Sequence, residues 1–218
     1  MTNEEIRQII ETLRVENRKF QEPIVTEVAK ERRSPFAVLI ATLISLRTKD
    51  VVTRQATQRL LSLASTPKKM RTLSVEEIEK AIYPAGFYHT KARRILELCD
   101  TLVEKYGGNV PDTLEELLEL KGVGRKTANL VITQGFGKLG ICVDTHVHRV
   151  SNRLGLVETK TPEKTEMALR QILPREYWIE YNDLLVTFGQ NICTPLSPHC
   201  SQCAIQPHCK RVGVQRSR

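Results

Sequence analysis

The strongest constraint on the fold is a series of helix-start signals, each followed by apolar residues at helical spacing. Three pairs have the spacing of a capping box, in which a side-chain acceptor precedes a carboxylate by three residues: Thr2 and Glu5, Ser74 and Glu77, Asp112 and Glu115. Ser34 and Thr161 each precede a proline that suits the first position of a helix. Alternating strand patterns bounded by hairpin turns are absent. The sequence therefore predicts an all-α fold of short helices, with an internal boundary at the turn-rich segment 135–140.

Composition is that of a globular chain with an excess of basic residues. The 218 residues are 40% hydrophobic and 27% charged, and the formal net charge is +8. A polyanionic partner fits that charge, but the excess is spread over both halves of the chain and does not by itself establish nucleic-acid binding. The longest nearly apolar run, 36–46, is too short to span a bilayer, and the first residues do not resemble a secretory signal. We expect a cytoplasmic protein.

Four of the six cysteines form a group near the end of the chain, in the pattern C-x6-C-x2-C-x5-C: Cys193, Cys200, Cys203 and Cys209. Core packing explains so dense a group poorly, and clustered thiols in a reducing compartment more often bind metal. The group predicts one four-coordinate site, which holds either a [4Fe–4S] cluster or zinc. Cys99 and Cys142 are most simply buried small hydrophobic residues.

A Gly-Val-Gly segment at 122–124 joins two expected helices, the first ending at Leu120 and the second starting near Arg125. Glycine allows close backbone approach, and the amide groups at the start of a helix can bind a phosphate. Such a contact positions a protein on any duplex and reads no base. A plain turn between helices explains the glycines about as well. The pair Arg125-Lys126 at the helix start favours the phosphate interpretation.

Two residues are candidates for covalent chemistry. The positive end of a helix disfavours an ammonium group, which favours a neutral, nucleophilic amine at Lys126; a solvated surface lysine is the common alternative. Asp144 could accept a proton or stabilise positive charge, with a helix N-cap as the strong alternative. His146 and His148 do not share a helix face, so we expect structural or DNA-proximal roles for them rather than metal binding.

Together these features resemble the endonuclease III family of the helix-hairpin-helix DNA glycosylases, and most closely its archaeal-type members. The matching segments are 35–50, 84–92, 120–132, 143–156 and the cysteine pattern. The resemblance implies two helical lobes with a cleft between them. A six-helix lobe at 28–138 would contain the helix-hairpin-helix at about 113–134. Residues 1–27 and 139–218 would form an iron–sulfur lobe.

The resemblance also implies an activity, that of a bifunctional DNA glycosylase and AP lyase of base excision repair. A damaged base, an oxidised pyrimidine, is extruded from duplex DNA. Lys126 attacks C1′ and forms a Schiff base, Asp144 assists, and β-elimination cuts the strand 3′ to the abasic site. The implied partner is double-stranded DNA with damaged bases or abasic sites, and a nucleoid-associated prokaryotic monomer is the simplest form.

The family pattern implies further contacts with DNA from residues that in part depart from it. Arg47 stands where many relatives carry glutamine, Phe87 where leucine is common, and Lys121 where proline is frequent. A surface salt bridge for Arg47 and a core position for Phe87 are the alternatives. The implied DNA-contacting set is Arg47, Phe87, Lys121, Gly122, Val123, Gly124, Arg125 and His146.

The cysteine spacing matches the [4Fe–4S] cluster of the family, which favours iron–sulfur over zinc. Two rival functions stay open. One is a mismatch-specific glycosylase that removes uracil or thymine, against which Lys126 argues. The other is a non-catalytic iron–sulfur protein that binds DNA, against which the presence of both Lys126 and Asp144 argues. The sequence leaves the spectrum of lesions and the preferred opposite base undetermined.

Overall fold

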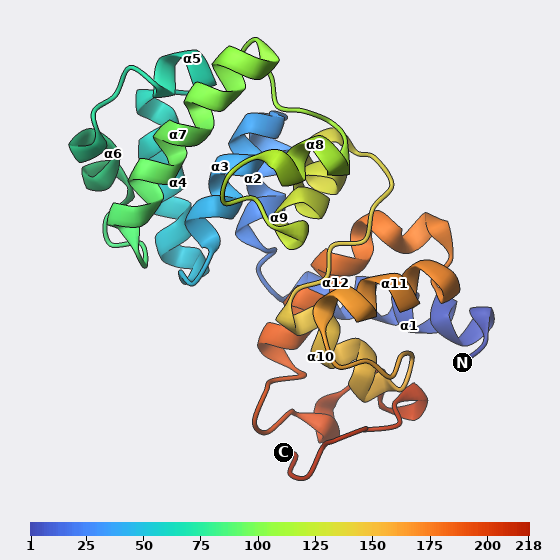
Figure 1. Cartoon of the computed structure of the whole chain (residues 1–218). Helices are drawn as coiled ribbons and strands as arrows, with labels where there is room; N and C mark the ends of the chain where they lie inside the picture. Colours follow the sequence, from blue (N-terminus) through green and yellow to red (C-terminus); the bar gives the residue numbers. More distant parts are fainter. The chain divides into compact units, whose positions relative to one another are not determined.

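The computed structural model describes residues 1–218, and its regular elements are helices throughout (Figure 1). The α-helices are α1 (Asn3–Glu16), α2 (Ile24–Arg32), α3 (Pro35–Ser45), α4 (Asp50–Leu63), α5 (Pro67–Met70), α6 (Val75–Ile82), α7 (Tyr88–Tyr106), α8 (Leu114–Glu119), α9 (Arg125–Leu130), α10 (Thr145–Leu154), α11 (Pro162–Ile172) and α12 (Trp178–Asn191). The remaining regular elements are short 3₁₀ turns and one π-helical segment, Val131–Gly135. None of these helices combines the length and apolarity that crossing a bilayer would require.

The chain forms two compact units. One is continuous, Ile24–Lys138, and the other combines Met1–Pro23 with Leu139–Arg218. The first unit starts four residues earlier than the boundary expected at residue 28, because α2 begins at Ile24 and packs against α3. The second boundary lies within the turn-rich segment 135–140.

Helix α3 is the centre of the unit 24–138. Every residue from Phe36 to Ile44 is buried, and α2, α4, α7 and α9 all contact this helix. Ser34 caps its start by accepting a hydrogen bond from the backbone N–H of Ala37. A helix that is apolar on all sides is stable only when other elements surround it, so α3 fixes the positions of its neighbours.

Helices α1, α10 and α12 supply the core of the other unit. Its members from these three helices include Ile10, Leu13, Val147, Leu154, Trp178, Tyr181 and Leu185. The hydroxyl groups of Tyr181 and Ser151 form a buried hydrogen bond of 3.0 Å. Three cysteines pack against the edge of this core, which ties the cysteine-rich segment to the helices.

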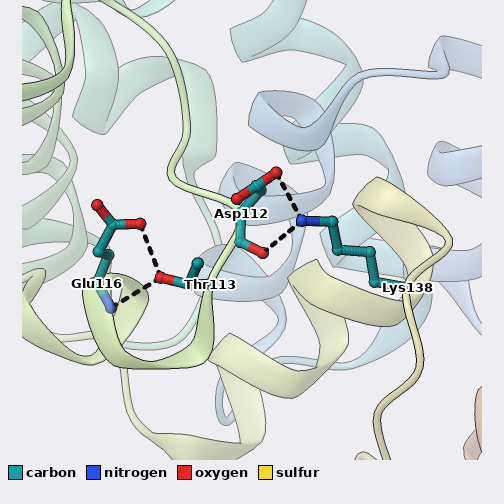
Figure 2. A network of polar contacts seen from close by, with 4 residues as sticks. All are labelled: Asp112, Thr113, Glu116 and Lys138. Atoms are coloured by element: carbon teal, nitrogen blue, oxygen red, sulfur yellow. Dashed lines mark hydrogen bonds and ion pairs between the residues drawn. The ribbon is translucent and has the colours of Figure 1, made fainter.

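The expected helix starts are confirmed with one exception. Complete capping boxes start α1 at Thr2 and α6 at Ser74, and Thr161 caps α11. The start expected at Asp112 is wrong, because Thr113 caps α8 and also bonds Glu116 (Figure 2). Asp112 instead accepts a hydrogen bond of 2.6 Å from the ammonium of Lys138, which joins the approach to α8 to the last residue of the unit (Figure 2).

Candidate functional site

The Gly-Val-Gly segment forms a tight hairpin between α8 and α9. Gly122 has φ +86°, a left-handed conformation that glycine adopts readily, whereas Gly124 is extended and is the N-cap of α9. The side chain of Val123 is only 6% exposed and anchors the hairpin in the core, so any contact with DNA there must come from its backbone. The ammonium of Lys121 lies 2.9 Å from the carboxylate of Glu97 and is otherwise exposed.

Helix α9 begins at Arg125, as expected, and Lys126 is its second residue. Both basic side chains are half-buried, while Thr127, Ala128 and Asn129 are buried. The N-cap residue, Gly124, has no side chain to cap the helix, and the first turn contains no acidic residue.

Asp144 is the N-cap of α10, as the alternative interpretation predicted. Its Oδ1 atom accepts hydrogen bonds from the backbone N–H groups of His146 at 2.8 Å and Val147 at 2.9 Å. The carboxylate is half-buried, and its position is fixed by both bonds. A cap role does not exclude chemistry, because both capping bonds use the same oxygen.

The two histidines after Asp144 are held by neighbouring side chains of the same unit. His146 Nδ1 lies 3.1 Å from a guanidinium nitrogen of Arg149, and His148 Nδ1 lies 2.7 Å from the hydroxyl of Thr165. Both rings are half-buried. These contacts fit the structural role that was one of the two expected; the DNA-proximal role stays a prediction.

The four cysteines of the C-terminal pattern line one cavity. Its empty space is about 360 Å³ including the open mouth, and apolar side chains such as Leu154, Phe188 and Ile205 complete its wall. No three His, Cys, Asp or Glu side chains converge closely enough to hold a single metal ion. Burial, with a smaller contribution from the neighbouring cysteines, raises the pKa of the Cys203 thiol to about 11. Binding of a metal centre there must therefore displace protons from thiols.

Two arginines of α10 fasten the segment that carries the first cysteine. The guanidinium of Arg149 donates to the carbonyl oxygens of Gly189 at 2.8 Å and Cys193 at 2.9 Å. Arg153 donates to the carbonyls of Thr194 and Pro195, and one of its nitrogens lies 3.4 Å from the sulfur of Cys193. The sequence interpretation missed both arginines, although their spacing of four residues places them on one face of a helix.

Buried Cys99 and Cys142 agree with the expectation of small core residues. Both are 0% exposed, and burial raises the pKa of the Cys99 thiol to about 12. They lie outside the C-terminal cysteine pattern and do not line its cavity.

Arg47 and Phe87 lie side by side on the surface of the unit 24–138. The guanidinium carbon of Arg47 is 5.0 Å from the centre of the Phe87 ring. Phe87 is 61% exposed, so the alternative of a core phenylalanine is wrong. Lys91 is buried and hydrogen-bonds the loop that carries Arg47. The sequence interpretation missed this residue, and its only signal was its place in the segment 84–92.

Comparison with known proteins assigns the family. Residues 40–175, more than half of the chain, match the family model described as HhH-GPD superfamily base excision DNA repair protein. Endonuclease III of Thermotoga maritima is 50% identical over 176 residues, which cover 81% of this chain and 83% of that protein. The chain belongs to the endonuclease III family. As a member of this family it is a DNA glycosylase and AP lyase of base excision repair. That enzymatic identity sets aside the non-catalytic alternative.

Two solved structures of endonuclease III share its fold. A non-covalent endonuclease III–DNA complex matches with a TM-score of 0.85 and 35% identity, covering 97% of this chain and 96% of that one. A trapped endonuclease III–DNA covalent intermediate, described as an estranged-adenine complex, matches with a TM-score of 0.77 and 39% identity, covering 82% and 84%. The two matches establish the endonuclease III fold for this chain. The expected likeness to archaeal-type members stays a prediction, because the sequence relative named above is bacterial.

Proposed function

We propose that this endonuclease III family member excises oxidised pyrimidines from duplex DNA with Lys126 as its nucleophile. The observation that carries the proposal is the placement of Lys126 in the first turn of α9, directly after the glycine hairpin. The amine leaves the helix beside backbone groups suited to a phosphate, so a sugar next to a bound phosphate comes within its reach. The covalent DNA intermediate trapped with a related endonuclease III supports a covalent route.

The proposed chemistry proceeds through a Schiff base. The neutral amine of Lys126 attacks C1′ of the extruded nucleotide, the C1′–N bond breaks, and the base leaves with a proton. Loss of the amine proton and opening of the sugar ring give an iminium ion. Its positive charge acidifies C2′, so removal of a C2′ proton expels the 3′ phosphate by β-elimination. Water then hydrolyses the imine and regenerates the lysine.

Asp144 supplies the assisting carboxylate in this proposal. It accepts the proton that Lys126 must lose, or it stabilises positive charge on the sugar. The two capping bonds from α10 support the proposal, because they hold the carboxylate in one position before substrate arrives.

The hairpin and the pair Arg47–Phe87 would make the contacts with DNA. Gly122 and Gly124 leave the backbone open to a phosphate beside the lesion, and Lys121 and Arg125 add positive charge. Arg47 would donate hydrogen bonds to the base opposite the lesion, and Phe87 would wedge into the stack. His146, the remaining candidate, has its ring beside Arg149, and we assign it an indirect role.

The four cysteines would hold a [4Fe–4S] cluster. They line one cavity, and their spacing matches the cluster pattern of the family, which supports iron–sulfur over zinc. Arg149 and Arg153 place positive charge next to Cys193, which favours ligation by negatively charged thiolates. The cluster would order the segment from Cys193 to Cys209 and would take no part in base removal.

Damaged double-stranded DNA is the proposed partner, and a cytoplasmic monomer associated with a prokaryotic nucleoid is the proposed form. The two solved endonuclease III–DNA complexes support DNA as the partner of relatives. A mismatch-specific glycosylase is the remaining alternative. A panel of thymine glycol, uracil, hypoxanthine and 8-oxoguanine, each opposite all four bases, separates the two, because the alternative requires mispaired uracil to be a better substrate than thymine glycol.

Borohydride trapping tests the nucleophile. The wild-type protein should form a covalent adduct with thymine-glycol and abasic duplexes, and Lys126→Ala should form none. Lys105→Ala is a matched control, because Lys105 is an exposed lysine at the end of α7 that pairs with Glu119. Binding of the duplex without any wild-type adduct would refute the lyase assignment.

Asp144→Asn separates chemistry from capping. Asparagine is as good an N-cap as aspartate, so α10 should keep its start while the charge is lost. The rate of base removal should fall about a hundredfold or more, as for loss of a general base, with little change in melting temperature. A wild-type rate for Asp144→Asn would show that Asp144 only caps the helix.

A further inference from the structure

The two residues proposed to engage the bases at the lesion have a backbone conformation that their side chains disfavour. Arg47 has φ +56° and Phe87 has φ +59°, both in the left-handed region. They lie on different segments, the loop after α3 and the turn before α7, yet their side chains stack on each other. Strained residues persist only where the surrounding structure holds them, so something must fasten these two segments.

Gly86 brings the two segments into direct contact. A Cβ atom at this position would lie 2.5 Å from the carbonyl oxygen of Arg47, closer than real Cβ contacts allow. The backbone N–H of Gly86 donates a hydrogen bond of 3.1 Å to the hydroxyl of Thr48. The backbone of the turn before α7 therefore lies directly against the backbone of the loop after α3.

The side chain of Lys91 binds the loop after α3 through hydrogen bonds. Its side chain is 7% exposed, and its ammonium donates to the carbonyls of Ile44 at 2.5 Å and Leu46 at 2.7 Å and to the Thr48 hydroxyl at 2.8 Å. Ile44 and Leu46 lie at the C-terminal end of α3, where carbonyl groups lack partners within the helix and where a cation is favoured. The three N–H groups of the ammonium thus match three acceptors.

The backbone of Lys91 completes the connection to Phe87. Its N–H donates a hydrogen bond of 3.0 Å to the carbonyl of Phe87, the N-cap of α7. One residue therefore contacts the loop that carries Arg47 through its side chain and the turn that carries Phe87 through its main chain. Burial lowers the pKa of Lys91 to about 8, so the lysine is mostly protonated at neutral pH and its three donors are present.

We propose that Lys91 is a positioning residue that holds Arg47 and Phe87 as one preformed element for reading the base opposite the lesion. The inference rests on the proposed function and adds to it the residue that builds the base-reading element. Two side chains already ordered in the free protein lose little conformational entropy when they enter a duplex. Loosening them should weaken only those steps in which an opposite base is engaged.

The experiment compares duplex with single-stranded substrate at pH 7. A single strand with an abasic site offers no opposite base, so its lyase rate reports the nucleophile without the base-reading element. In Lys91→Met, the ratio of duplex to single-strand rate should fall about tenfold, as expected when two side chains must be ordered on binding. The preference among the four opposite bases should flatten in parallel.

Thr48→Val provides a second variant that keeps the lysine and the shape of the side chain. It removes the hydroxyl shared by Lys91 and Gly86, and it should lower the same ratio by a smaller factor. Lys80→Met, at an exposed lysine of α6, is the control and should keep the wild-type ratio. Fluorescence of 2-aminopurine placed opposite an abasic analogue should show less unstacking with Lys91→Met and Thr48→Val than with the control.

Each outcome decides the proposal. A parallel loss on duplex and single-strand substrates would mean that Lys91 only stabilises the fold, and would overturn it. Wild-type ratios in Thr48→Val would overturn it even where Lys91→Met fails to fold. A wild-type protein that binds the abasic duplex but gives no borohydride adduct on it instead refutes the proposed function, independently of the base-reading element.

Discussion

Each of the two units holds a functional loop with a cationic side chain that donates hydrogen bonds to carbonyls at the end of a helix. The cation is a lysine in one unit and an arginine in the other. In the unit 24–138, Lys91 donates to carbonyls at the end of α3, and the loop that follows carries Arg47. In the other unit, Arg149 donates to the carbonyls of Gly189 and Cys193 at the end of α12, and the segment that follows carries the cysteines. A cation from a neighbouring helix satisfies carbonyls that each helix leaves unpaired.

The difference between the two cations indicates what each loop depends on. An arginine stays charged at every accessible pH and spans two carbonyls with its planar guanidinium, whereas a buried lysine can lose its proton. Burial lowers the pKa of both, to about 8 for Lys91. The loop with Arg47 therefore depends on protein contacts that are sensitive to pH, and the cysteine segment combines a permanent cation with the proposed metal centre.

The largest effect should come from removing that metal centre. The segment from Cys193 to Cys209 has only short 3₁₀ turns and two buried apolar residues, Pro198 and Ile205, so ligation must supply most of its order. In Cys203→Ser, hydrogen exchange in this segment should accelerate on the order of a thousandfold, about 4 kcal/mol. Exchange in the unit 24–138 should not change. A colourless wild-type protein that contains zinc after anaerobic purification would contradict the iron assignment.

Loss of the arginine should be the next largest effect. Arg149→Met leaves the carbonyls of Gly189 and Cys193 without their donor, which should lower the free energy of unfolding by about 2–4 kcal/mol in urea titrations. The iron content per chain should fall as well. Lys164→Met, at an exposed lysine of α11, serves as control. An Arg149→Met protein as stable as this control would show that the cysteine segment does not depend on its cation as the loop with Arg47 is proposed to do.

Two glycines allow the loops to be compared at single contacts. Gly86→Ala places a methyl group against the backbone carbonyl of Arg47 and should destabilise by about 1–3 kcal/mol. Gly189→Ala meets only the side chains of His146 and Arg149, at 2.9–3.0 Å, and gains helix propensity within α12. Its net effect should therefore be smaller. Thermal unfolding of both variants tests this prediction. Equal losses of stability in Gly86→Ala and Gly189→Ala would contradict it.

The smallest effect should be a pH dependence that only the lysine confers. Because burial lowers the pKa of Lys91 to about 8, the folded protein releases this proton at a lower pH than the unfolded chain does. Stability contributed by this group should therefore rise with pH. Relative to Lys91→Met, the wild type should gain about 1 kcal/mol between pH 7 and pH 9. A difference that is flat or falls over this range would show that the buried amine is not the titrating group.

Local patterns predicted much of the fold and the motifs of the site. Caps at Thr2, Ser74 and Thr161 act within three residues of the helices they start, so sequence spacing alone identifies them. The same locality explains the error at Asp112. Asp112 and Thr113 are both suitable N-cap residues for α8. Thr113 caps the helix, and Asp112 instead binds Lys138, which is 26 residues away in the chain.

The sequence by itself determined an all-α chain, the hairpin before Lys126, the capping aspartate Asp144 and the grouping of four cysteines. These features depend on interactions between residues close together in the chain. Only the tertiary structure decided that Lys91 binds the end of α3 and that Arg149 binds the end of α12, contacts between residues at least 40 positions apart in the chain. A lysine or an arginine on a helix has no local preference for a distant carbonyl. Its partner is determined only when packing removes both the cation and the carbonyl from water. Each group can then form a hydrogen bond only with the other.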